Sequence, residues 1–77
     1  MKVQVFAGLK EYFEPTFELE KDVQSIDGLK RQLIRLRPSS AALLESCRFA
    51  VNDDFVDVDY ELNEGDTIVI LPPSSGG

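Results

Sequence analysis

The residues best suited to chemistry in this 77-residue sequence lie at its C-terminal end. The sequence closes with Gly76-Gly77, and the segment before that pair is Leu71-Pro72-Pro73-Ser74-Ser75. Proline has no N–H and cannot continue a central strand, so Pro72 and Pro73 are expected to direct the last segment away from the body. Serine is small and glycine has no Cβ, so this segment is thin. A thin tail with a carboxylate at Gly77 can enter a narrow channel of another protein.

A carboxylate at Gly77 cannot react unaided, because it is a poor electrophile with a poor leaving group. The chain has no histidine, and therefore lacks the usual general base near neutral pH. It also has no Cys-His or Ser-His pair and no glycine-rich phosphate loop. We therefore interpret Gly77 as a carried reacting group rather than a catalyst, with Gly76 leaving room for the channel walls. No cofactor or metal is expected to be bound by this chain.

The composition limits the class of protein. An apolar fraction of 43% and a charged fraction of 29% are typical of one small soluble domain. No apolar run approaches the roughly 20 residues that cross a bilayer, and the N-terminus lacks the pattern of a signal peptide. The single cysteine, Cys47, excludes an internal disulfide framework. We expect a cytoplasmic protein without a membrane segment.

The charge is negative and unevenly distributed. A net charge of −6 argues against nucleic acid as a partner, because phosphates would repel the chain. Half of the basic residues lie between residues 30 and 37, and half of the acidic residues lie between residues 53 and 66. Two interpretations stay open: these charges keep the domain soluble, or the acidic half steers it onto a basic partner.

Two other features are tempting as chemical sites. Cys47 has only Arg48 as an activating neighbour in the sequence, which favours a structural thiol over a sulfur relay. The aspartates between residues 53 and 59 lack the glycine and the distal glutamate of a calcium loop, which favours an acidic turn.

The pattern of the first half predicts two strands and a helix. Apolar and polar residues alternate over 2–8 and again over 16–20, with a short helical or turn-like link over 9–14. Ser25 is typical of a helix N-cap, and Pro38 ends the helix. Apolar residues at helical spacing give this helix one apolar stripe. These residues are Ile26, Leu29, Leu33 and Leu36.

The second half predicts a short helical turn over 41–45 and three strands, over 48–52, 55–57 and 67–71. The turn over 63–66 places Gly65 where a positive φ is expected. The last strand is the most apolar, so we expect it at the centre of the sheet and buried on both faces. The order β-β-α-β-β-β predicts an α+β protein of the β-grasp (ubiquitin-like) class. In the predicted fold, one main helix packs across a mixed four- to five-stranded sheet. Residues 1–71 are predicted to form the domain, and residues 72–77 a flexible tail ending in Gly-Gly.

Four segments resemble the family of small, sulfur-carrier subunits of molybdopterin synthase, in the same order and over nearly the full length. They are Phe6-Ala7-Gly8-Leu9-Lys10-Glu11, Ala50-Val51-Asn52, Leu62-x-x-Gly65-Asp66 and Leu71-Pro72-Pro73-Ser74-Ser75-Gly76-Gly77. The sequence departs from the family pattern at Ser74, where an apolar residue is common, and at Lys10, where arginine is usual.

The resemblance implies a role in molybdenum cofactor biosynthesis. An E1-like adenylyltransferase would use ATP and Mg²⁺ to adenylate Gly77, and a persulfide sulfur would then replace AMP to leave a thiocarboxylate. The large subunit of molybdopterin synthase would pass that sulfur to cyclic pyranopterin monophosphate. The resemblance also implies a heterotetramer of small and large subunits, in which catalytic residues lie on the large subunit and this chain is a non-catalytic donor.

The resemblance places partner binding at Phe6 and Leu71, in an apolar patch that docks on both the activating enzyme and the large subunit. Lys10 would form a salt bridge with the activating enzyme. The residues alone leave alternatives open, because Phe6 is also suited to the core and Lys10 to a solvated surface.

Other functions stay open as well. The chain is also suited to sulfur delivery in another pathway, to thiazole, a tRNA base or an amino acid. A ubiquitin-like modifier that joins target lysines through Gly77 is a third hypothesis, and a plain interaction module is a fourth.

Overall fold

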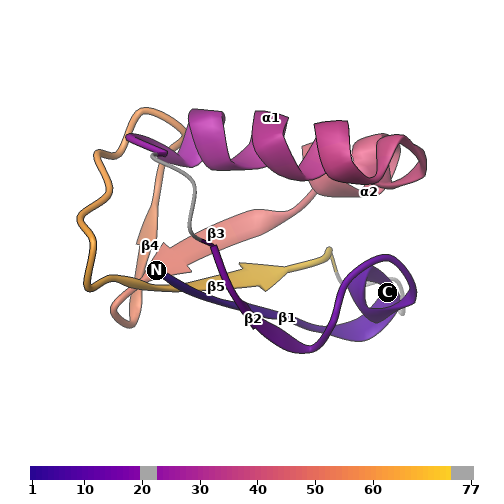
Figure 1. Cartoon of the computed structure of the whole chain (residues 1–77), viewed down its shortest axis with the longest axis horizontal. Coiled ribbons are helices and arrows are strands. Elements are labelled where there is room, and N and C mark those ends of the chain that lie inside the picture. Colours follow the sequence, from indigo (N-terminus) through magenta and orange to yellow (C-terminus); the bar gives the residue numbers. More distant parts are fainter. Residues whose placement is uncertain (20–22, 74–77) are drawn as a thin grey trace.

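The fold is built on a five-stranded sheet, and the longest helix of the protein lies across one face of that sheet (Figure 1). The computed structural model describes residues 1–19 and 23–73. In chain order the elements are β1 (Lys2–Val5), the 3-10 helix η1 (Ala7–Glu11), β2 (Thr16–Glu18), α1 (Ile26–Leu36), the 3-10 helix η2 (Pro38–Ser40), α2 (Ala41–Glu45), β3 (Arg48–Val51), β4 (Asp54–Val56) and β5 (Thr67–Leu71). The strand order is β2-β1-β5-β3-β4; β1 and β5 are parallel, and the other neighbours are antiparallel. The predicted β-grasp architecture is confirmed.

The first two strands are shorter than predicted. β1 ends at Val5. Phe6 keeps an extended backbone, but Ala7 takes a positive φ of 52° and starts η1, so the strand cannot continue to Gly8. A positive φ breaks the pleat of a strand. The buried side chain of Leu9 anchors η1 to the core. After this link, the chain returns to the sheet through a bond from the Val5 N–H to the Pro15 carbonyl, 2.9 Å long.

Helix α1 begins and ends where its sequence predicts. The Ser25 hydroxyl accepts a hydrogen bond from the Gly28 N–H at 3.1 Å, which satisfies one of the free donors at the helix start. The Asp27 carboxylate and Arg31 guanidinium, one turn apart, form a 3.0 Å ion pair. Three of the four predicted stripe residues are buried, but Leu36 in the last turn is exposed.

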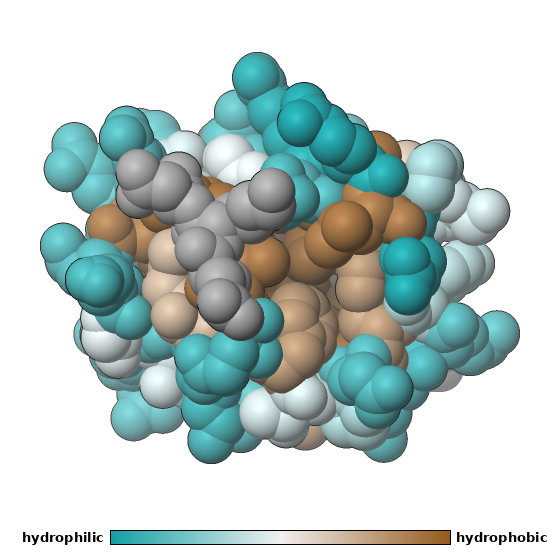
Figure 2. Space-filling view, viewed as in Figure 1, coloured by the Kyte–Doolittle hydropathy of each residue, from teal (hydrophilic) through white to brown (hydrophobic). Residues whose placement is uncertain are grey.

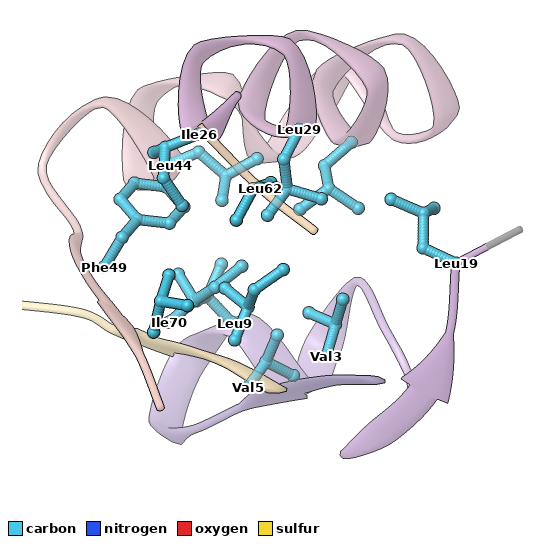
Figure 3. Close-up of a cluster of buried hydrophobic side chains, with 13 residues drawn as sticks. Val3, Val5, Leu9, Leu19, Ile26, Leu29, Leu44, Phe49, Leu62 and Ile70 are labelled. Atoms are coloured by element: carbon cyan, nitrogen blue, oxygen red, sulfur yellow. The ribbon is translucent and has the colours of Figure 1, made fainter. Parts of the chain in front are cut away.

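The core fills the space between α1 and the sheet, as Figure 3 shows. Strand β5 is central, as predicted, but the expectation that both of its faces are buried is wrong. Ile68 and Ile70 are fully buried against the helices, whereas Thr67, Val69 and Leu71 on the opposite face are only partly buried. The reason is that the described helices cover one face of the sheet and leave the other open. Figure 2 shows apolar surface gathered between α1 and the strands below it, bordered by hydrophilic side chains.

The turns differ from the prediction in where the backbone is left-handed. No described glycine has a positive φ, so the expectation for Gly65 is wrong. The left-handed residues are Asn52 (φ 50°) and Asp53 (φ 77°), which form the two-residue turn of the β3–β4 hairpin. This is the pattern of a type I′ turn, whose twist matches that of the flanking strands.

A side-chain network ties that hairpin turn to the start of β5. The buried Asp66 carboxylate accepts from the Asn52 side-chain amide at 3.0 Å and from the Asn63 N–H at 2.8 Å. The Asn52 side-chain oxygen accepts from the Thr67 N–H at 3.1 Å. Asn52 and Asp66 therefore fix the loop that leads into β5, the strand from which the C-terminal segment leaves.

Candidate functional site

The C-terminal segment leaves the sheet from its central strand. β5 ends at Leu71, Pro72 is partly buried, and Pro73 is exposed. The strand therefore stops where the two prolines predicted, because proline cannot donate to either neighbouring strand. The other predicted tail residues, Ser74, Ser75, Gly76 and Gly77, lie outside the described residues. The division into a domain over 1–71 and a tail over 72–77 stays a prediction.

Phe6 and Leu71 lie on the open face of the sheet. The parallel register aligns Val5 with Ile70, and both of these side chains are in the core. Because side chains alternate along a strand and Phe6 remains extended (φ −132°, ψ 163°), Phe6 and Leu71 project from the opposite face. Phe6 is 42% exposed and Leu71 is partly buried. The interpretation of Phe6 as a core residue is therefore wrong, and its role in partner binding stays a prediction.

The same face carries three further apolar residues, Ala50, Phe55 and Val69. The registers place Val69 opposite Ala50, and Ala50 opposite Phe55, so all three side chains lie on one face. Arg48 is aligned with Leu71, and its guanidinium carbon lies 3.8 Å from the centre of the Phe55 ring. We call these residues the open-face patch: Phe6, Arg48, Ala50, Phe55, Val69 and Leu71.

Of the five apolar members of the patch, the family resemblance indicates only Phe6 and Leu71. Alternation over 48–51 and 67–71 was the signal that could have placed Ala50 and Val69 on this face. Placing Phe55 on this face requires the hairpin register, which aligns it with Ala50. The guanidinium over its ring is a cation–π contact, which holds Arg48 flat on the patch instead of extended into solvent.

Lys10 lies away from this patch. It is an exposed residue in the last turn of η1, and it lines a groove of about 420 Å³ together with Arg37, Leu36 and Phe13. The three ion pairs found within the described residues do not include Lys10. The predicted contact with an activating enzyme therefore has an accessible cation, but stays a prediction.

The Cys47 thiol is hydrogen-bonded to the backbone and partly shielded from solvent. It donates to the Leu43 carbonyl at 3.1 Å, and it is partly buried. Burial raises the pKa of the Cys47 thiol, and the nearby Lys30 ammonium offsets that rise only in part. A raised pKa keeps the thiol protonated near neutral pH and therefore weakly nucleophilic, in agreement with the structural thiol that was predicted.

The described part of the chain has neither a metal-binding cluster nor a membrane-spanning helix. Over residues 1–19 and 23–73, no three His, Cys, Asp or Glu side chains gather closely enough to hold a metal ion. None of the helices in that part of the chain is long and apolar enough to cross a membrane.

Comparison with known proteins gives matches over the whole chain. Residues 3–77 match the ThiS family. The molybdopterin synthase sulfur carrier subunit of Chlamydomonas reinhardtii is 38% identical, with 100% of this chain and 98% of that protein covered. The protein of the same name from Dictyostelium discoideum is 33% identical, with coverages of 99% and 94%.

Solved structures show the same fold. Small archaeal modifier protein 1 of Methanosarcina acetivorans superposes with a TM-score of 0.82 at 23% identity, covering 99% of this chain and 94% of that one. A chain of the complex of subunits 1 and 2 of molybdopterin-converting factor from Helicobacter pylori gives a TM-score of 0.70 at 28% identity, with coverages of 99% and 96%.

Proposed function

The chain belongs to the ThiS family, and from that premise we propose that it is the sulfur-carrier subunit of a molybdopterin synthase. The observation that carries the proposal is the full-length match to two proteins named as sulfur carriers of that synthase. The family match extends to residue 77 and so includes the Gly76-Gly77 pair. The likeness to a small archaeal modifier, below 25% identity, supports the fold alone.

The proposed chemistry takes place on the carboxyl group of Gly77. An E1-like adenylyltransferase transfers AMP from Mg·ATP to the carboxylate and releases pyrophosphate, which provides the leaving group that a carboxylate lacks. The terminal sulfur of a persulfide then displaces AMP, and a thiol cleaves the resulting acyl disulfide to leave the thiocarboxylate. In this proposal the chain supplies a tethered acyl group and no acid–base catalyst, in keeping with a sequence that has no histidine.

The proposed acceptor is cyclic pyranopterin monophosphate bound to the large subunit of the synthase. The thiocarboxylate sulfur is a soft nucleophile, and its transfer would build the dithiolene of molybdopterin. The Helicobacter pylori structure contains subunits 1 and 2 of a molybdopterin-converting factor in one complex, which supports a partner protein for this chain. We propose a heterotetramer with that large subunit.

The open-face patch is the proposed docking surface for both partners. Phe6 offers an exposed ring, Leu71 adjoins the segment that must enter the partner, and Arg48 covers one face of Phe55. Partly buried apolar residues that lie beside each other lose little conformational freedom on binding, which favours them as an interface.

The test is reconstitution with the large subunit from the same host. Chain bearing a thiocarboxylate at Gly77 should convert cyclic pyranopterin monophosphate to the dithiolene product, and chain with an ordinary carboxylate should not. A Gly76→Val variant should fail, because its branched side chain meets the channel wall, whereas Ser74→Ala, two residues earlier and smaller than serine, should retain transfer. Full sulfur transfer by Gly76→Val would contradict the proposed threading of the tail.

A further inference from the structure

One edge of the sheet is open to a further strand. In the order β2-β1-β5-β3-β4, strand β4 has a described neighbour only on the β3 side. The two-residue turn makes Val51 and Asp54 a hydrogen-bonded pair, so the next pair, Ala50 and Phe55, is not hydrogen-bonded. The N–H and C=O of Phe55 therefore point away from β3, toward the free side. Unpaired backbone groups on an edge strand are a template for another extended chain.

Beside this edge lies an open groove of about 790 Å³, whose lining combines apolar residues with Arg48, Asp57 and Asp59. Among the described residues, three of the five exposed large hydrophobic side chains line it: Phe55 (54%), Val58 (47%) and Tyr60 (38%). The other two do not line this groove: Phe6 lies elsewhere on the open-face patch that Phe55 shares, and Leu36 lies in the last turn of α1. Exposed apolar side chains gathered in one groove mark an interaction site more strongly than scattered ones do.

The wall of the groove is held in place by the start of α1. The Asp27 N–H donates to the Val58 carbonyl at 2.8 Å, and the Ile26 N–H donates to the Tyr60 carbonyl at 3.1 Å. Two of the four free donors at the helix start are thus used to position the segment that carries Val58 and Tyr60. The side chains are exposed while their backbone is fixed, so a bound segment would meet a preformed surface.

The charge at this edge indicates the chemistry of the occupant. Asp54, Asp57 and Asp59 are exposed, and they take part in none of the three ion pairs found in the described chain. The cation among the groove residues, Arg48, is placed over the Phe55 ring. The rim is therefore negative, which favours a partner segment that carries Lys or Arg and disfavours a second copy of this acidic chain.

The opposite edge of the sheet differs in its groove and in the charge around it. Bonds from the Leu19 N–H to the Met1 carbonyl and from the Val5 N–H to the Pro15 carbonyl leave the N–H groups of Thr16 and Glu18 pointing outward from β2. None of the three residues of β2 is an exposed large hydrophobic residue. The two edges thus offer similar backbone groups, but the groove beside β2 is smaller, about 420 Å³, and its acidic residues Glu11 and Glu14 are balanced by Lys10 and Arg37.

We propose that β4 binds an extended, basic polypeptide segment of a partner protein as a sixth strand of the sheet. The segment would bond to the outward N–H and C=O of Phe55, place apolar side chains against Val58 and Tyr60, and direct cations to Asp57 and Asp59. Because Arg48 is aligned with Leu71 and contacts Phe55, this edge adjoins the open-face patch. The inference goes beyond the proposed function, since it adds a backbone-bonded strand at the β4 edge and involves no residue of the tail.

The test is an NMR titration of the ¹⁵N-labelled protein with a synthetic peptide of alternating lysine and valine. Amide shifts should gather in 54–60, and exchange of the Phe55 amide proton with solvent should slow. Shifts that gather on β2, on Phe6 and Leu71, or nowhere at millimolar peptide would overturn the proposal. Concentration-dependent shifts at β4 without peptide would assign the edge to a second copy of the chain instead.

Matched variants isolate the backbone bond. Phe55→Val keeps the outward N–H and Phe55→Pro removes it, with side chains of similar size, so the proline variant should bind about tenfold more weakly than the valine variant. Glu18→Pro makes the same change at the opposite edge and should leave affinity unchanged. Equal affinity of the two Phe55 variants would overturn the added strand. If Phe55→Pro does not fold, synthetic protein with an N-methyl group at Phe55 makes the same comparison.

The charge is tested separately with a peptide of alternating glutamate and valine. Equal binding of the acidic and basic peptides would overturn the assignment to a basic segment. If the protein takes up sulfur at Gly77 but does not bind the basic peptide, this inference alone is refuted. If it binds the peptide but takes up no sulfur at Gly77, the proposed function alone is refuted.

Discussion

Replacing Asp66 by alanine is predicted to destabilise the domain strongly, although the residue takes no part in the proposed chemistry. The residue is only 7% exposed, and its carboxylate accepts two hydrogen bonds, from the Asn52 side chain at 3.0 Å and from the Asn63 N–H at 2.8 Å. The first bond joins the β3–β4 turn to the residue before β5, and the second closes the turn over 63–66. Asp66→Ala removes both acceptors and leaves the two donors without these partners.

The magnitude follows from the nature of these bonds. A hydrogen bond to a charged group contributes about 1.5–3 kcal/mol, and the partial exposure of the donors favours the lower end of that range. At that lower end the two bonds together give a loss of about 3 kcal/mol in the free energy of unfolding. In a domain of this size such a loss lowers Tm by roughly 12–24 °C, and it is a large part of a total stability of about 5–15 kcal/mol.

Urea unfolding followed by far-UV circular dichroism measures the effect, with variants of Asn52 as controls. Asn52→Gly removes the side-chain bonds but accepts the φ of 50°, whereas Asn52→Ala also strains the backbone and should be about 1 kcal/mol less stable than the glycine variant. Asp66→Ala should cost about 1 kcal/mol less in the Asn52→Gly background than in the natural chain. A loss below about 0.5 kcal/mol for Asp66→Ala alone would refute the reasoning.

Four further predictions concern the core, the helix, the docking surface and the thiol. Ile70→Ala should lower the free energy of unfolding by about 2–5 kcal/mol in the same urea assay, since its side chain is fully buried in the central strand. Gly28→Ala should raise the free energy of unfolding by about 0.5–1 kcal/mol, because alanine has the higher helix propensity and its Cβ would lie 3.4 Å from the Val23 side chain, at ordinary contact distance. A decrease would show that the Cβ does not fit beside Val23. Phe6→Glu should leave stability within about 0.5 kcal/mol of the natural chain but weaken binding of the large subunit by at least about tenfold in calorimetry; unchanged binding would exclude Phe6 from the interface. Because burial raises the pKa of Cys47, iodoacetamide at neutral pH should alkylate this thiol more slowly in the folded protein than in the urea-unfolded protein. The alkylation rate of the folded protein should also rise at a higher pH than that of the unfolded protein, and equal pH profiles would contradict the raised pKa.

The elements that local patterns determine could be predicted from the sequence. Helix α1 follows from the Ser25 cap, the apolar spacing and Pro38, and the structure reproduces those limits. β5 is central because the most apolar strand gains most from two neighbours. The prediction that both its faces are buried was wrong, because strand periodicity does not indicate how many layers cover a sheet.

The features that depend on register could not be predicted. Phe55 joins the open-face patch only because the hairpin register aligns it with Ala50, and that register depends on a turn whose left-handed residues are Asn52 and Asp53 rather than a glycine. The motifs around Asn52 and Asp66 are part of the family resemblance, yet the contact between these two residues, 14 positions apart, appears only in the fold. Their meaning is structural: they hold the strand from which the C-terminal segment leaves.

The central claim is that Gly77 carries sulfur, and the intact mass of the protein tests it most directly. The chain should be incubated with the E1-like enzyme of its host, ATP, Mg²⁺ and a persulfide donor, and then fragmented to locate any change. The account predicts a mass gain equal to the replacement of one oxygen by one sulfur, located at Gly77 and absent without ATP. No gain, with the same enzyme active on another carrier, would contradict the account.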